Sequence, residues 1–98
     1  MARLPNRKTV QPKARARFTE QYGIMMEMLI ELRLKSGITQ ADMGRQLGKS
    51  QSHVSMWERR ESEMSVIDVL NWCQVVGVGA GKFFDLFERR VTALSKKH

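Results

Sequence analysis

Side chains that can take part in specific polar interactions are concentrated between residues 39 and 58, in the stretch TQADMGRQLGKSQSHVSMWE. Most are uncharged amides and hydroxyls, among them Gln51, Ser52 and Ser55. Such groups donate and accept hydrogen bonds at neutral pH, whereas they do not take up or release protons there. Their chemistry is therefore the recognition of a partner by its pattern of hydrogen-bonding groups.

Catalysis is not indicated elsewhere in the chain. The sequence offers no constellation of paired carboxylates, no nucleophile beside a base and no phosphate-binding loop. His53, His98 and Cys73 are the only histidines and the only cysteine, too few to suggest a metal site. We therefore expect no enzyme activity, no metal and no cofactor. The lone cysteine agrees with a reducing compartment, and we expect a cytoplasmic protein.

The net charge of +7 is unevenly distributed. Residues 1–17 carry six Lys and Arg and no acid, residues 18–88 carry seven basic and ten acidic side chains, and residues 89–98 carry four basic and no acidic ones. Basic blocks favour polyanionic partners, with nucleic acid first and an anionic membrane surface second. Membrane binding is disfavoured because the basic arm lacks an apolar face, and no apolar run is long enough to span a bilayer.

Apolar residues recur at helical spacing and no strand pattern of comparable strength appears, so the sequence predicts an all-α fold with five helices. The first helix is expected from about Phe18 to Lys35 and the last from about Lys82. A length of 98 residues predicts one domain. The expected organisation is a flexible basic arm over 1–17, a helical domain over 18–88, and the basic end of the last helix with its tail over 89–98.

Three helices are expected to bury an apolar stripe, with Trp57 and Trp72 in the same core. The last helix is longer than a small core needs, so its first half should close the core and its second half should pair with a second copy. The stripes are Ile24, Met25, Met28, Leu29 and Leu32 in the first helix, Val66, Val69, Leu70, Cys73 and Val76 in the fourth, and Phe83, Phe84, Phe87, Val91 and Leu94 in the last.

Residues 39–58 predict two short helices joined by a tight turn. Thr39 and Ser50 are suited to cap them, and Gly48 can adopt the left-handed conformation that ends the first. Gly44 is the small residue that the first of these helices needs where the second helix crosses it. Met43, Leu47, Val54 and Trp57 would hold the two helices together. The side chains left outward on the second helix are Gln51, Ser52, Ser55, Met56 and Arg59.

This pattern resembles the lambda repressor and Cro-like helix-turn-helix family, often called Xre. The resemblance covers about residues 29–87 and is carried by LRLKSGITQADMGRQLG, SQSHVSMWERRES and VVGVGAGKFFDLF. It implies a five-helix DNA-binding domain with double-stranded DNA as partner. The chain departs from the family at Gly44, where Ala is usual, at Lys49, where an apolar residue is frequent, and at Arg60 and Met64, where Gly and Pro are common.

The resemblance also assigns roles to individual residues, although a merely solvated helix face is the alternative for the polar ones. Gln51 is the best candidate for direct readout of adenine, and Met56 for contact with a thymine methyl. Arg33 and Glu58 match a structural ion pair of the family. The implied base-reading residues are Ser50, Gln51, Ser52, Ser55 and Met56, and the implied phosphate-binding residues are Gln40, Lys49 and Arg59.

Two features lie outside the motif. The N-terminal arm is either disordered or in contact with DNA, since basic arms of helix-turn-helix proteins reach into a groove. The C-terminal tail either extends the phosphate contacts or only solubilises the last helix. The candidate contacts of the arm are Arg3, Arg7, Lys8, Lys13, Arg15 and Arg17.

The function expected from the resemblance is a sequence-specific transcriptional regulator, most simply a repressor. A homodimer paired through Phe87, Val91 and Leu94 would read an inverted-repeat operator. The alternative is an antitoxin that binds a toxin and also represses its own operon. A toxin-like gene beside this one would favour the alternative.

Overall fold

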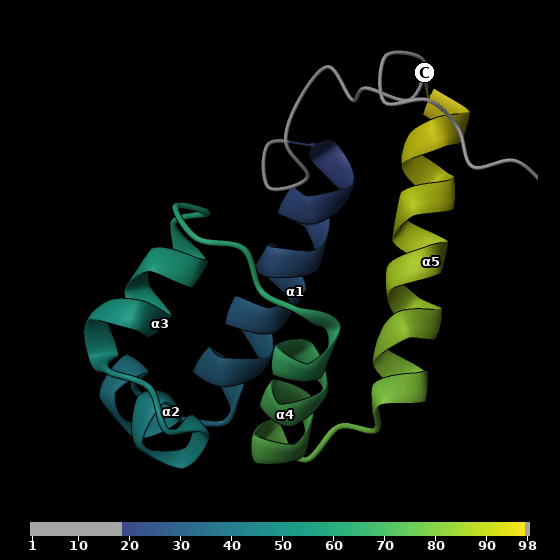
Figure 1. Cartoon of the computed structure of the whole chain (residues 1–98). Helices are drawn as coiled ribbons and strands as arrows, with labels where there is room; N and C mark the ends of the chain where they lie inside the picture. Colours follow the sequence, from purple (N-terminus) through teal and green to yellow (C-terminus); the bar gives the residue numbers. More distant parts are fainter. Residues whose placement is uncertain (1–18, 98) are drawn as a thin grey trace, which may run out of the picture.

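The computed structural model describes residues 19–97, which form five helices and no strand (Figure 1). The predicted all-α fold is therefore confirmed. No helix in this part of the chain is both long and apolar enough to cross a membrane. The helices are α1 (Glu20–Lys35), α2 (Gln40–Leu47), α3 (Gln51–Glu58), α4 (Val66–Val76) and α5 (Ala80–Lys97).

The helix α1 begins after Thr19, whose hydroxyl accepts a hydrogen bond from the backbone N–H of Tyr22 at 3.1 Å. Its buried face differs from the expected one. Tyr22 and Met26 are buried together with Met28 and Leu29, whereas the expected Ile24, Met25 and Leu32 are only partly buried. Apolar residues surround this helix on nearly every side, so their spacing does not select one face. The aromatic ring of Tyr22 and the ion pair of Arg33 select it instead.

The core lies where the five helices meet. Trp57, Trp72 and Phe83 are its largest fully buried side chains. The two tryptophan rings lie 6.4 Å apart between centroids, and the indole N–H of Trp72 donates to the carbonyl of Leu29 at 3.0 Å. Both tryptophans are therefore core residues, as predicted.

The start of α4 is more exposed than its apolar sequence suggests. Ser65 and Asp68 form the expected capping box, with each side chain bonded to the backbone N–H of the other. Val66, which was expected in the buried stripe, is 71% exposed, and Ile67 is 61% exposed. The first turn carries the cap at the edge of the bundle, so burial begins only at Val69.

The helix α5 begins at Ala80, two residues earlier than expected, and runs to Lys97, so that it includes residues of the basic C-terminal end. It runs antiparallel to α1, on the flank of the bundle opposite α3 (Figure 1). Phe83 is fully buried, and Phe84 and Phe87 pack against the core. Val91 and Leu94 are half-buried and lie beyond that core.

Candidate nucleic-acid interface

The helices α2 and α3 are defined at their ends by local hydrogen bonds. The hydroxyls of Thr39 and Ser50 each accept a backbone N–H, from Asp42 and His53 respectively, at 3.0 Å. Gly48 has a φ of 69° and ends α2 in the left-handed conformation. These three predicted features are confirmed, and together they fix the short turn between α2 and α3.

The close crossing of the two helices depends on Gly44. A Cβ placed there would lie 2.6 Å from the carbonyl oxygen of Lys49 and 3.2 Å from that of Ser50. Both obstacles are backbone atoms, so a side chain at Gly44 requires the two helices to move apart. Beneath the crossing, Met43, Val54 and Trp57 are almost fully buried, which confirms their predicted role.

The outer face of α3 carries the residues expected to read bases. Gln51, Ser52 and Met56 are exposed and Ser55 is half-buried. Their spacing places them on one side of the helix, which we call the reading surface (Gln51, Ser52, Ser55 and Met56). This surface is uncharged, and Met56, which is 37% exposed, gives it one apolar contact point.

An ion pair below α3 supports the reading surface. The guanidinium of Arg33 donates to both carboxylate oxygens of Glu58, at 2.6 and 3.0 Å, and a further N–H reaches the carbonyl of Ile38 at 2.9 Å. The side chains of the pair are only 9% and 8% exposed. The structural ion pair implied by the resemblance is thus present and ties α1 to α3.

The same carboxylate orients two glutamine side chains. Gln40 donates from its Nε2 to Glu58 at 2.9 Å, and Gln51 donates from its Nε2 to the Oε1 of Gln40 at 2.7 Å. Because an ionised carboxylate only accepts, it fixes which end of the Gln40 amide faces inward, and the exposed oxygen of Gln40 then fixes Gln51. The side-chain oxygen and one N–H of Gln51 stay directed to solvent.

The contacts of Gln40 show a role that the sequence did not reveal. Its amide was expected to hold a phosphate, yet it links Glu58 to Gln51. An amide nitrogen has two hydrogens, so one N–H is left for a phosphate beside the N-terminus of α2. Two glutamines eleven residues apart could have suggested this contact only after the angle between α2 and α3 was known.

Arg59, expected to hold a phosphate, is also engaged within the chain. Its guanidinium donates to the two carboxylate oxygens of Glu61 at 3.1 and 3.0 Å and to the hydroxyl of Ser55 at 2.6 Å. The hydrogen bond from Arg59 lowers the pKa of Glu61, and the same bond raises the pKa of Arg59. Glu61 was not among the expected site residues.

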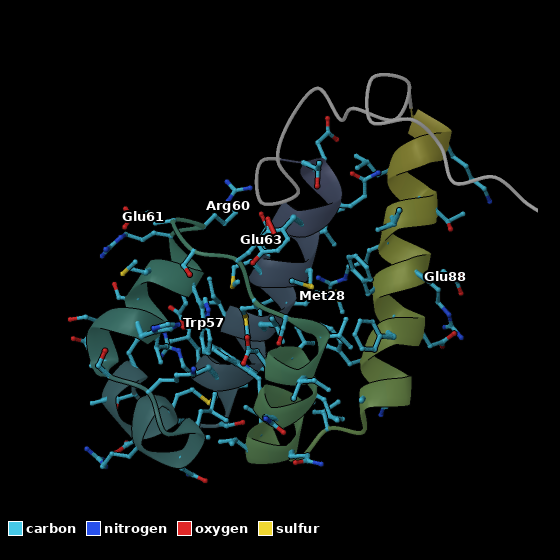
Figure 2. The ribbon with its side chains drawn as sticks, in the orientation of Figure 1. Met28, Trp57, Arg60, Glu61, Glu63 and Glu88 are labelled. Atoms are coloured by element: carbon cyan, nitrogen blue, oxygen red, sulfur yellow. The ribbon has the colours of Figure 1, made fainter. Side chains whose placement is uncertain are left out.

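The turn after α3 explains how Glu61 reaches Arg59. Arg60 has a φ of 60°, and the backbone N–H groups of Arg60 and Glu61 donate to the carbonyls of Trp57 and Met56 at 3.0 and 2.8 Å. This is a Schellman motif with an arginine where glycine is usual. The loop therefore keeps the path that a glycine would give, and Glu61 lies at its outer tip (Figure 2).

The remaining expected residues have varied surroundings. Lys49 is exposed in the turn before α3, and the hydroxyl of Ser50 serves as the helix cap. The ring of His53 packs edge-on against Trp57, with 4.7 Å between centroids. The candidate arm contacts from Arg3 to Arg17 lie outside the described residues.

Metal binding has no support within residues 19–97, where no three His, Cys, Asp or Glu side chains are grouped to hold an ion. Cys73 is fully buried, and burial raises the pKa of its thiol. The thiol therefore stays protonated at neutral pH and serves as a core residue.

A helix-turn-helix family model matches residues 29–83, a segment that runs from α1 into α5 and includes all of α2 and α3. The chain therefore belongs to the lambda repressor-like (Xre) helix-turn-helix family, whose members are DNA-binding transcription regulators. The resemblance predicted from the sequence is confirmed. No curated protein and no solved structure matches the chain.

Proposed function

We propose that this chain is a sequence-specific repressor that binds an inverted-repeat operator as a homodimer. The observation that carries the proposal is the fixed orientation of Gln51, which is held by Gln40 at 2.7 Å and thereby by the buried carboxylate of Glu58. A side chain oriented before binding loses less entropy on contact and tolerates fewer alternative partners.

Gln51 is oriented to recognise adenine in the major groove. Adenine presents an acceptor at N7 and a donor at N6, which match the available N–H and the side-chain oxygen of Gln51. A bidentate pair of this kind discriminates against the wrong base by about 1 to 3 kcal/mol. Gln51 is therefore the main determinant of sequence preference in this account.

The other residues of the interface have supporting roles. Met56 contacts a thymine methyl, and the hydroxyls of Ser50, Ser52 and Ser55 bond to base edges. Gln40 uses its second N–H for a phosphate at the N-terminus of α2, and the exposed Lys49 holds another beside α3. The phosphate-binding residues, together with the basic ends of the chain, supply affinity that is independent of sequence.

Dimerisation is proposed through the second half of α5. Phe87 belongs to the stripe but packs against the core, so Val91 and Leu94 supply most of the remaining apolar surface. An open groove lined by Phe84, Phe87 and Val91 adjoins them on the side of Gln21. Because α5 lies on the flank opposite α3, its pairing leaves the reading surface uncovered (Figure 1).

Repression would follow from occupancy of the promoter. Two recognition helices related by a two-fold axis bind half-sites about one helical turn apart, and the bound dimer excludes the polymerase.

The test compares Gln51→Ala with Gln46→Ala, which removes the same amide from an exposed position on α2 outside the reading surface. Fluorescence anisotropy measures affinity for an operator selected from random DNA and for unselected DNA. We expect Gln51→Ala to reduce the difference between the two binding free energies by about 1 to 3 kcal/mol per half-site, which lowers the ratio of the two affinities, while unselected DNA is bound as before. Gln46→Ala should keep the ratio. Equal ratios for both variants would contradict the role of Gln51.

A further inference from the structure

The guanidinium of Arg59 is occupied by groups of its own chain at the C-terminal end of the recognition helix. Two of its nitrogens face the two oxygens of Glu61 at 3.1 and 3.0 Å, and the third donates to Ser55 at 2.6 Å. Arg59 and Glu61 are 58% and 55% exposed. The pair therefore lies at the surface, next to a residue of the reading surface.

The geometry of this pair is the geometry with which arginine binds phosphate. The planar fork of a guanidinium matches two oxygens of a carboxylate or of a phosphate in the same bidentate manner. The pair is solvent-exposed, so it stabilises the chain only weakly and its carboxylate can be exchanged for another anion. The hydrogen bond from Arg59 lowers the pKa of Glu61, so the carboxylate is ionised at neutral pH and competes with other anions for Arg59.

We propose that Glu61 occupies Arg59 in place of a DNA phosphate, so that binding at this end of the recognition helix exchanges one anion for another. The inference rests on the proposed function, because it gives Glu61 a part in controlling the affinity of the same DNA interface. Glu61 is thereby an internal competitor that reduces affinity without touching a base.

The exchange also links phosphate binding to Ser55. While Arg59 holds Glu61, its third nitrogen donates to the Ser55 hydroxyl, and that hydroxyl is thereby positioned over the helix. When the guanidinium turns toward a phosphate, the Ser55 hydroxyl loses this donor, and a second lone pair becomes free to accept from a base edge. A contact that carries no sequence information thus changes the hydrogen bonds that are open to one that does.

The salt dependence of DNA binding distinguishes this role from a general effect of charge. In the native chain the exchange leaves the Glu61 carboxylate beside the DNA phosphates, where its negative charge keeps cations nearby and offsets part of the counterion release. In Glu61→Gln nothing offsets the release, and the slope of log affinity against log salt should become steeper by up to about 0.9. Affinity at low salt should rise about two- to fivefold, the range typical of an exposed ion pair.

Glu63→Gln is the matched control. It removes the same charge from the same loop, yet Glu63 is exposed, makes no hydrogen bond to Arg59 and lies further along the loop (Figure 2). We expect its slope to equal that of the native chain. In an Arg59→Ala background, Glu61→Gln should no longer steepen the slope beyond Glu63→Gln.

The outcomes separate this inference from the proposed function. Equal slopes for Glu61→Gln and Glu63→Gln would overturn the exchange while leaving DNA binding established. A loss of affinity in Glu61→Gln would also overturn it, because Glu61 would then help Arg59 to bind DNA. Failure of the native chain and of every variant to bind DNA at any salt concentration would overturn the proposed function and this inference with it.

Discussion

Glu58 has two partners that belong to different tasks. Its carboxylate neutralises Arg33 in the buried ion pair and also accepts the amide of Gln40. The first contact joins α1 to α3, and the second determines how Gln51 faces solvent. One carboxylate therefore couples the stability of the fold to the orientation of Gln51, the side chain proposed to read bases.

Removing that carboxylate should be costly. In Glu58→Ala, Arg33 stays buried without its counter-charge, which typically destabilises a protein by about 3 to 5 kcal/mol. Urea denaturation followed by circular dichroism measures the change. Glu63→Ala, at an exposed position of the next loop, should stay within about 0.5 kcal/mol of the native chain. Similar losses in both variants would show that the pair of Arg33 and Glu58 is not a main contributor to stability.

For the helices, the sequence predicts where each one begins and ends better than which side of it is buried. Ser50, Ser65 and Gly48 act only on their immediate neighbours, so their roles could be predicted from their positions. The buried side of α1 could not, because it depends on contacts with distant segments: Tyr22 accepts a hydrogen bond from the backbone N–H of Met64 at 2.9 Å. The bidentate ion pair of Arg59 and Glu61 could not be predicted from the sequence either, because it requires Arg60 in the left-handed conformation.

Two glycines within helices should respond oppositely to the same substitution. Replacing a helical glycine by alanine gains about 0.5 to 1 kcal/mol from helix propensity. At Gly23 the new Cβ would meet only the mobile end of Arg60, at 2.7 Å, whereas at Gly44 it would meet backbone at 2.6 Å. Gly23→Ala should therefore stabilise the chain by about that amount, and Gly44→Ala should destabilise it by about 1 to 3 kcal/mol.

Thermal unfolding of both variants measures the difference, and each serves as the control of the other. Stabilisation by Gly44→Ala would mean that α2 and α3 can separate without strain, and the close crossing would then not explain the glycine.

At the scale of the whole molecule, affinity, specificity and pairing are assigned to different regions. The reading surface on α3 is uncharged, the basic residues concentrate at the two ends of the chain, and the apolar stripe proposed for pairing lies on α5. The helix α5 is held beside α1 mainly by Phe83, Phe84 and Phe87, which pack against the core, and Arg90 adds an exposed ion pair with Glu31 at 3.8 Å. Pairing through α5 could then present two reading surfaces without altering either.

Val91→Glu should convert the dimer to a monomer because it places a charge in the apolar stripe that pairing would bury. Sedimentation velocity over a range of protein concentrations measures the association. Ala93→Glu adds the same charge at an exposed position of α5 and should keep the native association. A native chain that stays monomeric at all concentrations, or a dimer that survives Val91→Glu, would exclude this interface.

The central claim is that this chain reads a defined DNA sequence with paired recognition helices. Selection of bound sequences from random double-stranded DNA, performed at a low and a high salt concentration, tests it most directly. We expect an inverted repeat with half-sites centred about one helical turn apart, enriched more strongly at high salt because non-specific phosphate binding weakens there. Recovery of no enriched sequence at either salt concentration would contradict the claim.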